Sequence, residues 1–177
     1  MSTNRKDFTM TGKTHMAGGI AAGTAVGFAL NLPMEHFIIA TFAGGVGGLI
    51  PDIDSATSTI TSKTGPAGFI ISRIFRHRGV LHTPVAYIVL NCVLWVIAGN
   101  IGYTNIAFPL LTGMFAGEIS HLLLDSLNRV GIMWLWPYPR RFSVLHVPSN
   151  GRFNTLCRYV LWGMAGYLIA YKIMRGC

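Results

Sequence analysis

The sequence predicts an all-α, multi-pass membrane protein built from about four to five apolar helices. Hydrophobic residues make up 51% of the chain, charged residues make up 11%, and the mean hydropathy is +0.49. A soluble globule of this size needs more polar surface than such a composition supplies, so a membrane protein is the expected class. The length of 177 residues suits one domain. Residues 1–177 are therefore expected to form a single membrane-embedded unit.

Five apolar segments mark the expected helices, at about residues 16–31, 36–50, 84–104, 107–125 and 157–174. The third and fifth approach the roughly 20 residues that a helix needs to span a bilayer, whereas the first two are shorter. Glycines recur along these first two segments, at positions 19, 23 and 27 and at positions 44, 45, 47 and 48. Because small residues let helix backbones approach closely in lipid, the first two segments are predicted to form a tight hairpin.

The basic residues predict the orientation of the chain. With a cytoplasmic N-terminus, twelve of the 14 lysine and arginine residues lie on the cytoplasmic side, and only Lys172 and Arg175 lie outside. This bias follows the positive-inside rule. The expected cytoplasmic parts are a tail over residues 1–14 and two interfacial connections over residues 51–83 and 126–156. Topology thus explains the net charge of +8, with membrane lipids and no specific nucleic acid as expected partners.

Ionisable residues gather at the cytoplasmic boundary that this topology defines. They lie at the start of the first apolar segment, after the second, before the third and at the end of the fourth: His15; Asp52 and Asp54; His77 and His82; His121 and Asp125. Charged groups at the edge of a bilayer are costly unless they neutralise one another or bind an ion. Imidazole and carboxylate together form a ligand set for a transition metal. The sequence therefore predicts a site for a divalent metal, with zinc preferred over manganese or iron.

The segment GEISHLLLD adds local support for this site. His121 and Asp125 are four residues apart, so both lie on one helix face and can reach the same ion. Glu118 lies on that face too, three residues before His121. The spacing leaves open whether Glu118 binds the metal, acts as a base or orients a ligand. It also leaves open which PDID carboxylate and which HRGVLHTP imidazole bind directly, and whether His146 contributes.

Four short motifs follow one another in the chain: THMAGG, PDID, HRGVLHTP and GEISHLLLD. In this order they resemble the YdjM-like family of bacterial inner-membrane, metal-dependent hydrolases, and the resemblance covers nearly the whole chain. It implies a location in the cell inner membrane and a helical metal-site core distantly similar to zinc-dependent phospholipase C and the P1-type nucleases. It also implies one or two metal ions. The ligands carried over by motif are His15, Asp52 or Asp54, His77 or His82, and His121 with Asp125.

The expected function is hydrolysis of a phosphoester, in the favoured case one borne by a lipid, at the cytoplasmic face. The bond type follows from the resemblance and from the basic residues, among which Arg78, or else Arg140 or Arg141, would neutralise phosphate oxygens. Glu118 is the expected catalytic carboxylate. The alternatives are a small metal or ion transporter and a non-catalytic adaptor whose fold the metal stabilises. Because the span centres hold almost no ionisable side chains, a continuous ion path is disfavoured.

Overall fold

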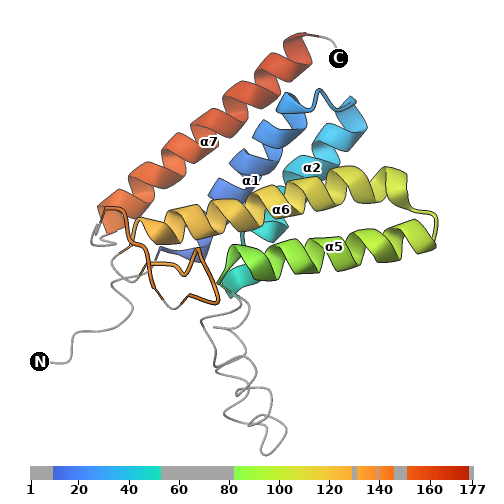
Figure 1. The fold of residues 1–177 in the computed structure, drawn as a ribbon. Helices are drawn as coiled ribbons and strands as arrows, with labels where there is room; N and C mark the ends of the chain where they lie inside the picture. The colour runs from blue at the N-terminus through green and yellow to red at the C-terminus, as the bar shows by residue number, and fades with distance from the viewer. Residues whose placement is uncertain (1–9, 53–81, 129–130, 139, 146–150, 176–177) are drawn as a thin grey trace, which may run out of the picture.

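The computed structural model of the protein describes residues 10–52, 82–128, 131–138, 140–145 and 151–175 (Figure 1). Its elements, in chain order, are α1 (Gly12–Ala29), α2 (Met34–Gly47), the 3-10 helix η2 (Ile50–Asp52), α5 (Pro84–Asn100), α6 (Thr104–Ser126) and α7 (Gly151–Met174). No β-strand occurs within these ranges, where Ile132 and Phe142 form an isolated antiparallel bridge. The predicted all-α class is therefore confirmed for the described chain.

Each of the five predicted apolar segments corresponds to one α-helix. Four of the helices begin earlier than expected: α2 and α6 start shortly before their predicted segments, α1 starts at Gly12 within the predicted tail, and α7 starts at Gly151 within the second predicted connection. The start of α5 follows ordinary capping rules, since the Thr83 hydroxyl accepts a hydrogen bond from the Ala86 amide at 3.4 Å. Pro84 then occupies the first helical position, where no backbone N–H is needed.

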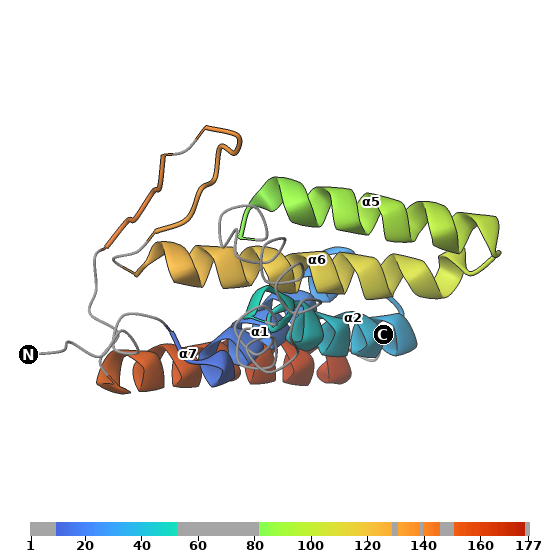
Figure 2. The ribbon, with the colours of Figure 1, turned by 90° about the horizontal axis from the view of Figure 1, so that it is seen from below.

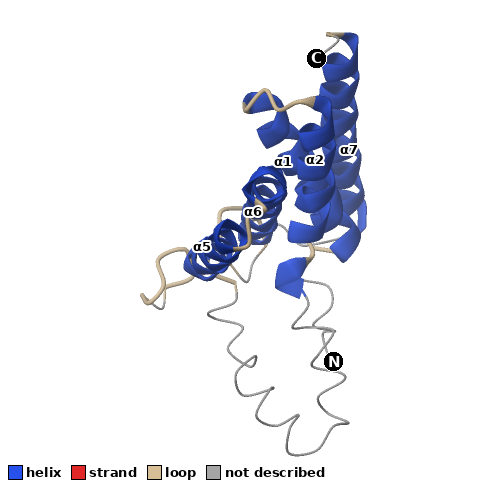
Figure 3. Cartoon of the chain, turned by 90° about the vertical axis from the view of Figure 1, so that its right-hand side faces the viewer, coloured by secondary structure: helices blue, strands red, loops and turns tan. Residues whose placement is uncertain are grey.

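The helices form two crossed layers. α1, α2 and α7 lie side by side in one layer, and α5 and α6 form the other, which crosses the first obliquely (Figures 1 and 3). α6 packs against both α1 and α2, whereas α5 packs chiefly against α6 and α7 chiefly against α1. Figure 2 shows the two layers from below, with α6 between α5 and the first layer. α6 is therefore the element that joins the layers.

Glycines make the close contacts between α1, α2 and α6. A Cβ atom added at Gly44 of α2 would collide with the backbone of Gly19 and Gly23 in α1, which confirms the predicted glycine-lined hairpin. The same face of α2 also receives α6, because a Cβ atom added at Gly117 would collide with the backbone of Gly44 and Gly48. The sequence pattern did not identify this second contact. Gly117 therefore belongs to a three-helix junction.

Within the described ranges, two helices have the length and apolarity of a membrane span, fewer than the four to five predicted. They are Met34–Asp52, formed by α2 and η2 over 19 residues, and α6 over 23 residues. α5 is apolar but has 17 residues. α1 is rich in glycine, alanine and threonine, and α7 carries Arg152, Arg158 and Lys172, so both are less apolar than a typical span.

Large apolar side chains nevertheless face outward along the helices. Phe42 on α2 is 73% exposed, and Val96 on α5 and Val160 on α7 are 60% and 62% exposed. Contiguous apolar surface of this kind marks contact with a membrane or a partner protein. The outer faces of both layers are thus suited to an apolar environment.

Candidate metal site

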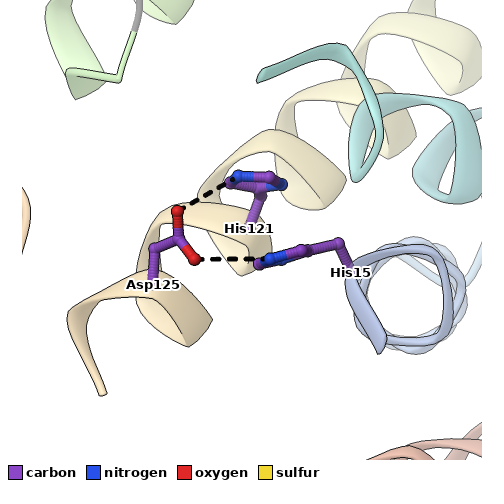
Figure 4. Close-up of side chains that lie close together, drawn as sticks. All are labelled: His15, His121 and Asp125. Carbon is purple, nitrogen blue, oxygen red and sulfur yellow. Dashed lines mark ion pairs between the residues drawn. The ribbon is translucent and has the colours of Figure 1, made fainter. Parts of the chain in front are cut away.

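The helix ends that carry the predicted ligands meet at one end of the molecule. The start of α1 and the end of α6 contribute His15, His121 and Asp125, which lie together in Figure 4. α7 begins at the same end, where the Thr14 hydroxyl donates to the Asn154 carbonyl at 3.5 Å. The helix directions therefore alternate as the predicted topology requires.

His15, His121 and Asp125 form the buried centre of the cluster. The rings of His15 and His121 are stacked, with centroids 3.8 Å apart and an angle of 21° between their planes. Asp125 faces both rings, with Oδ1 at 3.3 Å from Nε2 of His15 and Oδ2 at 3.5 Å from Nε2 of His121 (Figure 4). Both histidines are almost fully buried. Each oxygen of one carboxylate thus lies close to a different imidazole.

Asp52 and His82 also lie close to His121 and extend the cluster. Asp52 Oδ1 lies 3.9 Å from Nε2 of His121, and the His82 ring centroid lies 5.7 Å from that of His121. One potential ligand atom from each of Asp52, His82 and His121 lies within 4.8 Å of the others, and the same holds for His15, His121 and Asp125. His121 therefore belongs to two overlapping ligand groups. Asp54 and His77, the alternatives left open by the sequence, lie outside the described residues.

A backbone hydrogen bond sets the tautomer of the neutral His121 ring. Nδ1 lies 2.8 Å from the carbonyl oxygen of Gly48, and because a carbonyl can only accept, Nδ1 must carry the hydrogen of this bond. The Nε2 lone pair of the neutral ring is then directed at the carboxylates. Nε2 is buried and makes no hydrogen bond, and neither does Nδ1 of His15. Acceptor atoms that face one another in a buried site require a proton or a cation between them, so this geometry fits a metal ligand set.

Asn128 holds the Asp125 carboxylate in place. Its Nδ2 atom donates to Asp125 Oδ1 at 3.1 Å, and its side chain is buried. The chain after α6 folds back to support this arrangement, because the Ser143 hydroxyl donates to the Asn128 carbonyl at 2.6 Å. The Trp134 indole N–H donates to the Ser126 hydroxyl at 2.8 Å. The ligand motifs did not mark Asn128, although an amide three residues after a helical ligand is a recognisable signal for an orienting partner.

The structure separates Glu118 from the ligand groups. Glu118 is fully buried, and its carboxylate accepts a hydrogen bond from Nδ2 of Asn91 on α5 at 2.7 Å. Within the described chain it belongs to neither of the two ligand groups. Spacing alone put Glu118 on the ligand face of α6, but the packing of α5 directs its side chain to a different partner.

The other predicted site residues lie apart from the cluster or outside the described chain. Arg78 and His146 lie outside the described residues. Arg140 and Arg141 are described and exposed, on the connection between α6 and α7. His36 lies at the start of α2, at the opposite end of that helix from Gly48. Its Nε2 atom is 3.9 Å from Oε1 of Glu35. The cluster therefore rests on residues from α1, η2, the start of α5 and α6.

Comparison with known proteins gives a family match over nearly the whole chain. The family model described as YdjM inner membrane protein matches residues 10–175. YvsG of Bacillus subtilis (strain 168) is 32% identical over 145 residues, covering 82% of this chain and 84% of that protein. The inner membrane protein YdjM of Escherichia coli (strain K12) is 33% identical over 113 residues, covering 63% of this chain and 56% of that protein. No solved structure matches the chain.

Proposed function

The chain belongs to the family of YdjM inner membrane proteins, and from this premise and its His–Asp cluster we propose that it is a membrane-bound, metal-dependent hydrolase. The observation that carries the proposal is Nε2 of His121, which is buried without a hydrogen bond and faces the carboxylates of Asp125 and Asp52. Buried charged groups are normally paired or coordinate a metal. A divalent cation accounts for the three groups together.

The described residues offer two places for a metal. His15, His121 and Asp125 would hold one ion, and a second would take Asp52 and His82 with His121. Nitrogen and carboxylate donors without cysteine favour zinc, with manganese and iron as alternatives. The comparison with phospholipase C and P1 nuclease remains a prediction, because the fold has no match among solved structures.

A bound divalent cation supplies Lewis acidity, which makes water a stronger acid and polarises a phosphoryl oxygen. The chain contributes the arrangement around that chemistry. The Gly48 carbonyl fixes the tautomer of His121, and the Asn128 amide fixes the orientation of Asp125. Ligands held in advance by such hydrogen bonds need little rearrangement when a substrate arrives.

We assign the substrate to the phosphoesters, with a lipid-borne ester favoured. The support is the basic charge predicted at the cytoplasmic boundary, which suits an anionic substrate, and the apolar outer surface of the helices. Arg78 is the proposed partner of the phosphate oxygens, with Arg140 and Arg141 as exposed alternatives. The proposed topology is multi-pass, with the N-terminus and the metal site on the cytoplasmic side.

Metal content of the protein purified from membranes tests this proposal. The parent protein is expected to retain a divalent metal in elemental analysis, and His121→Ala and Asp125→Ala are expected to lose it while remaining in the membrane. His36→Ala is the matched control, because His36 also lies beside an acid but at the opposite end of α2. Equal metal content in all four proteins would show that the cluster is not a metal site.

A second measurement separates the enzyme from the alternative functions. The metal-loaded parent is expected to hydrolyse at least one member of a panel of phospholipids and model phosphodiesters. The variants His121→Ala and Asp125→Ala are expected to hydrolyse none of them. Bound metal without hydrolysis of any ester would indicate the non-catalytic adaptor. Uptake of the metal into sealed vesicles that contain the protein would indicate a transporter.

A further inference from the structure

Glu118 is a buried acid with an unusual environment. It is 0% exposed, and among the described residues its one hydrogen-bond partner is the neutral side chain of Asn91. The packing on either side is apolar, since Tyr87 lies one turn before Asn91 and Leu122 one turn after Glu118, and these two belong to one buried cluster. An ionised carboxylate without a cationic partner is strongly unfavourable in such surroundings.

The hydrogen bonds between α5 and α6 leave acceptors without donors. Both N–H groups of the Asn91 amide are used, one donating to the Tyr87 carbonyl at 2.9 Å and the other to Oε2 of Glu118 at 2.7 Å. Two buried oxygen atoms then remain without a hydrogen-bond partner, namely Oε1 of Glu118 and Oδ1 of Asn91. A proton on Oε1 turns one of these acceptors into a donor and removes the charge.

We propose that the pair Glu118–Asn91 is a proton site, in which Glu118 is held in its protonated form at neutral pH and supplies that proton to the leaving oxygen of a substrate bound at the His–Asp cluster. Glu118 precedes His121 by three residues and Asp125 by seven, so the three positions share one face of α6, with Glu118 about two turns from the end of the helix, although Asn91 holds the Glu118 carboxylate toward α5. Asn91 is a positioning residue, because it acts through Glu118.

The role of the proton rests on the proposed hydrolysis. When the oxygen of water forms a bond to phosphorus and the bond from phosphorus to the leaving oxygen breaks, the leaving oxygen needs a proton. Glu118 Oε1 supplies it, and the carboxylate that remains recovers a proton released by the attacking water. The sum of these transfers leaves Glu118 unchanged after each turnover.

Infrared spectroscopy of the purified full-length protein tests the proton site without reference to metal or activity. A protonated carboxyl group has a C=O stretching band that is separate from the carboxylate bands and shifts in D₂O. The chain has 6 acidic residues, so few groups can contribute. The band is expected in the parent at neutral pH and is expected to disappear in Glu118→Gln, which preserves the shape of the side chain.

Two further variants make this result specific. Glu35→Gln is the matched control, because the Glu35 side chain is 79% exposed on α2, and its spectrum should keep the band. Asn91→Leu should keep the band but move it to higher frequency, because the Glu118 carbonyl loses its N–H donor. The proton site would be disproved by a parent spectrum without the band, or by a band that persists in Glu118→Gln.

Metal content and turnover test the connection to the cluster. Glu118→Gln should bind as much metal as the parent. A loss of metal like that expected of His121→Ala would make Glu118 a ligand and overturn the proposal.

Turnover of an alkyl phosphodiester should fall by at least about 100-fold in Glu118→Gln, whereas turnover of a p-nitrophenyl ester, whose leaving group needs no proton, should be affected much less. Equal losses for both esters would refute proton donation. If the parent hydrolyses neither ester, the proposed function fails, and the infrared result still decides the protonation of Glu118.

Discussion

At His121, one hydrogen bond determines what the side chain can bind. The Gly48 carbonyl takes the Nδ1 hydrogen and leaves Nε2 as the only ring atom with a free lone pair, surrounded by carboxylate oxygens. A histidine in this tautomer is a ready ligand, whereas the opposite tautomer would donate to Asp125 and would give up the Gly48 bond. The chemistry of the cluster therefore depends on a backbone atom of α2 as much as on its own side chains.

Asn128 gives a prediction at the same scale. Asn128→Ala removes the amide that donates to Asp125 Oδ1, so the carboxylate becomes free to rotate, and metal affinity is expected to fall about 10- to 100-fold. Competition with a chelator of known affinity measures this change. Asn100→Ala is the control. Asn100 is an exposed residue at the end of α5, and its side-chain amide donates a hydrogen bond to the Val96 carbonyl of the same helix. Unchanged affinity in Asn128→Ala would contradict the orienting role.

Among the elements, α6 has the most contacts that matter for function. Its Gly117 meets α2, its Glu118 meets α5, and its His121 and Asp125 complete the ligand groups. Because these positions follow one another within three turns, a rotation of α6 about its axis would disturb all three contacts at once. The glycine junction therefore sets the position of the ligands as well as the stability of the helix layers.

Substitution of Gly117 tests this dependence. Gly117→Ala places a methyl group against the backbone of Gly44, and overpacking of this kind is expected to lower the free energy of unfolding by about 1–3 kcal/mol. The loss should appear although alanine is the better helix former. Gly163→Ala in α7 is the control, because no atom of another helix lies within 4 Å of the added methyl group. This substitution should be neutral or stabilising. Thermal unfolding in detergent, followed by circular dichroism, measures both.

For the whole molecule, the sequence predicts which helix ends lie together at the cluster. It does not predict which hydrogen bonds the side chains form there. Topology inferred from lysines and arginines brought His15, Asp52, His82, His121 and Asp125 to one end, and the structure places them together. The same inference could not show that Glu118 turns to α5, because that depends on how the two layers cross. The Asn91 and Gly48 contacts were also beyond prediction, since each joins residues far apart in the chain through an atom that no motif marks.

The number of spans was the weaker part of the prediction. Apolar segments located the helices, but apolarity alone does not separate a helix that crosses the bilayer from one that is buried against its neighbours. α1 illustrates the difference, because many of its glycine, alanine and threonine residues are buried against other helices instead of facing outward. Its composition reflects close packing, and small and hydroxyl-bearing residues lower the hydropathy of the helix.

Reporter fusions test the proposed topology. With five crossings and a cytoplasmic N-terminus, alkaline phosphatase fused after residue 177 should be active, and green fluorescent protein at the same place should be dark. Green fluorescent protein inserted after Val144, between α6 and α7, should fluoresce. The physical reason is the concentration of basic residues in the segments that are predicted to be cytoplasmic. The reverse pattern would place the site on the other side of the membrane.

One contact at the other end of the molecule involves a basic residue that departs from the charge bias. The buried Lys172 of α7 donates from Nζ to Oδ1 of Asn31 at 3.2 Å, joining the end of α7 to the turn between α1 and α2. Both residues lie on the predicted outer side. Lys172, one of the two basic residues that depart from the charge bias, is thus held by the fold, and its position does not conflict with the orientation.

The spread of the cluster along the chain has a consequence for how the protein is made. His15 lies in α1, which is synthesised well before the end of α6 that carries His121 and Asp125. The α1–α2 hairpin is therefore made with an incomplete cluster, and the Gly48 carbonyl lacks its His121 partner until α6 follows. If the cluster holds the proposed metal, capture of the ion has to wait for the synthesis of α6, and a chain truncated before α6 is expected not to retain it.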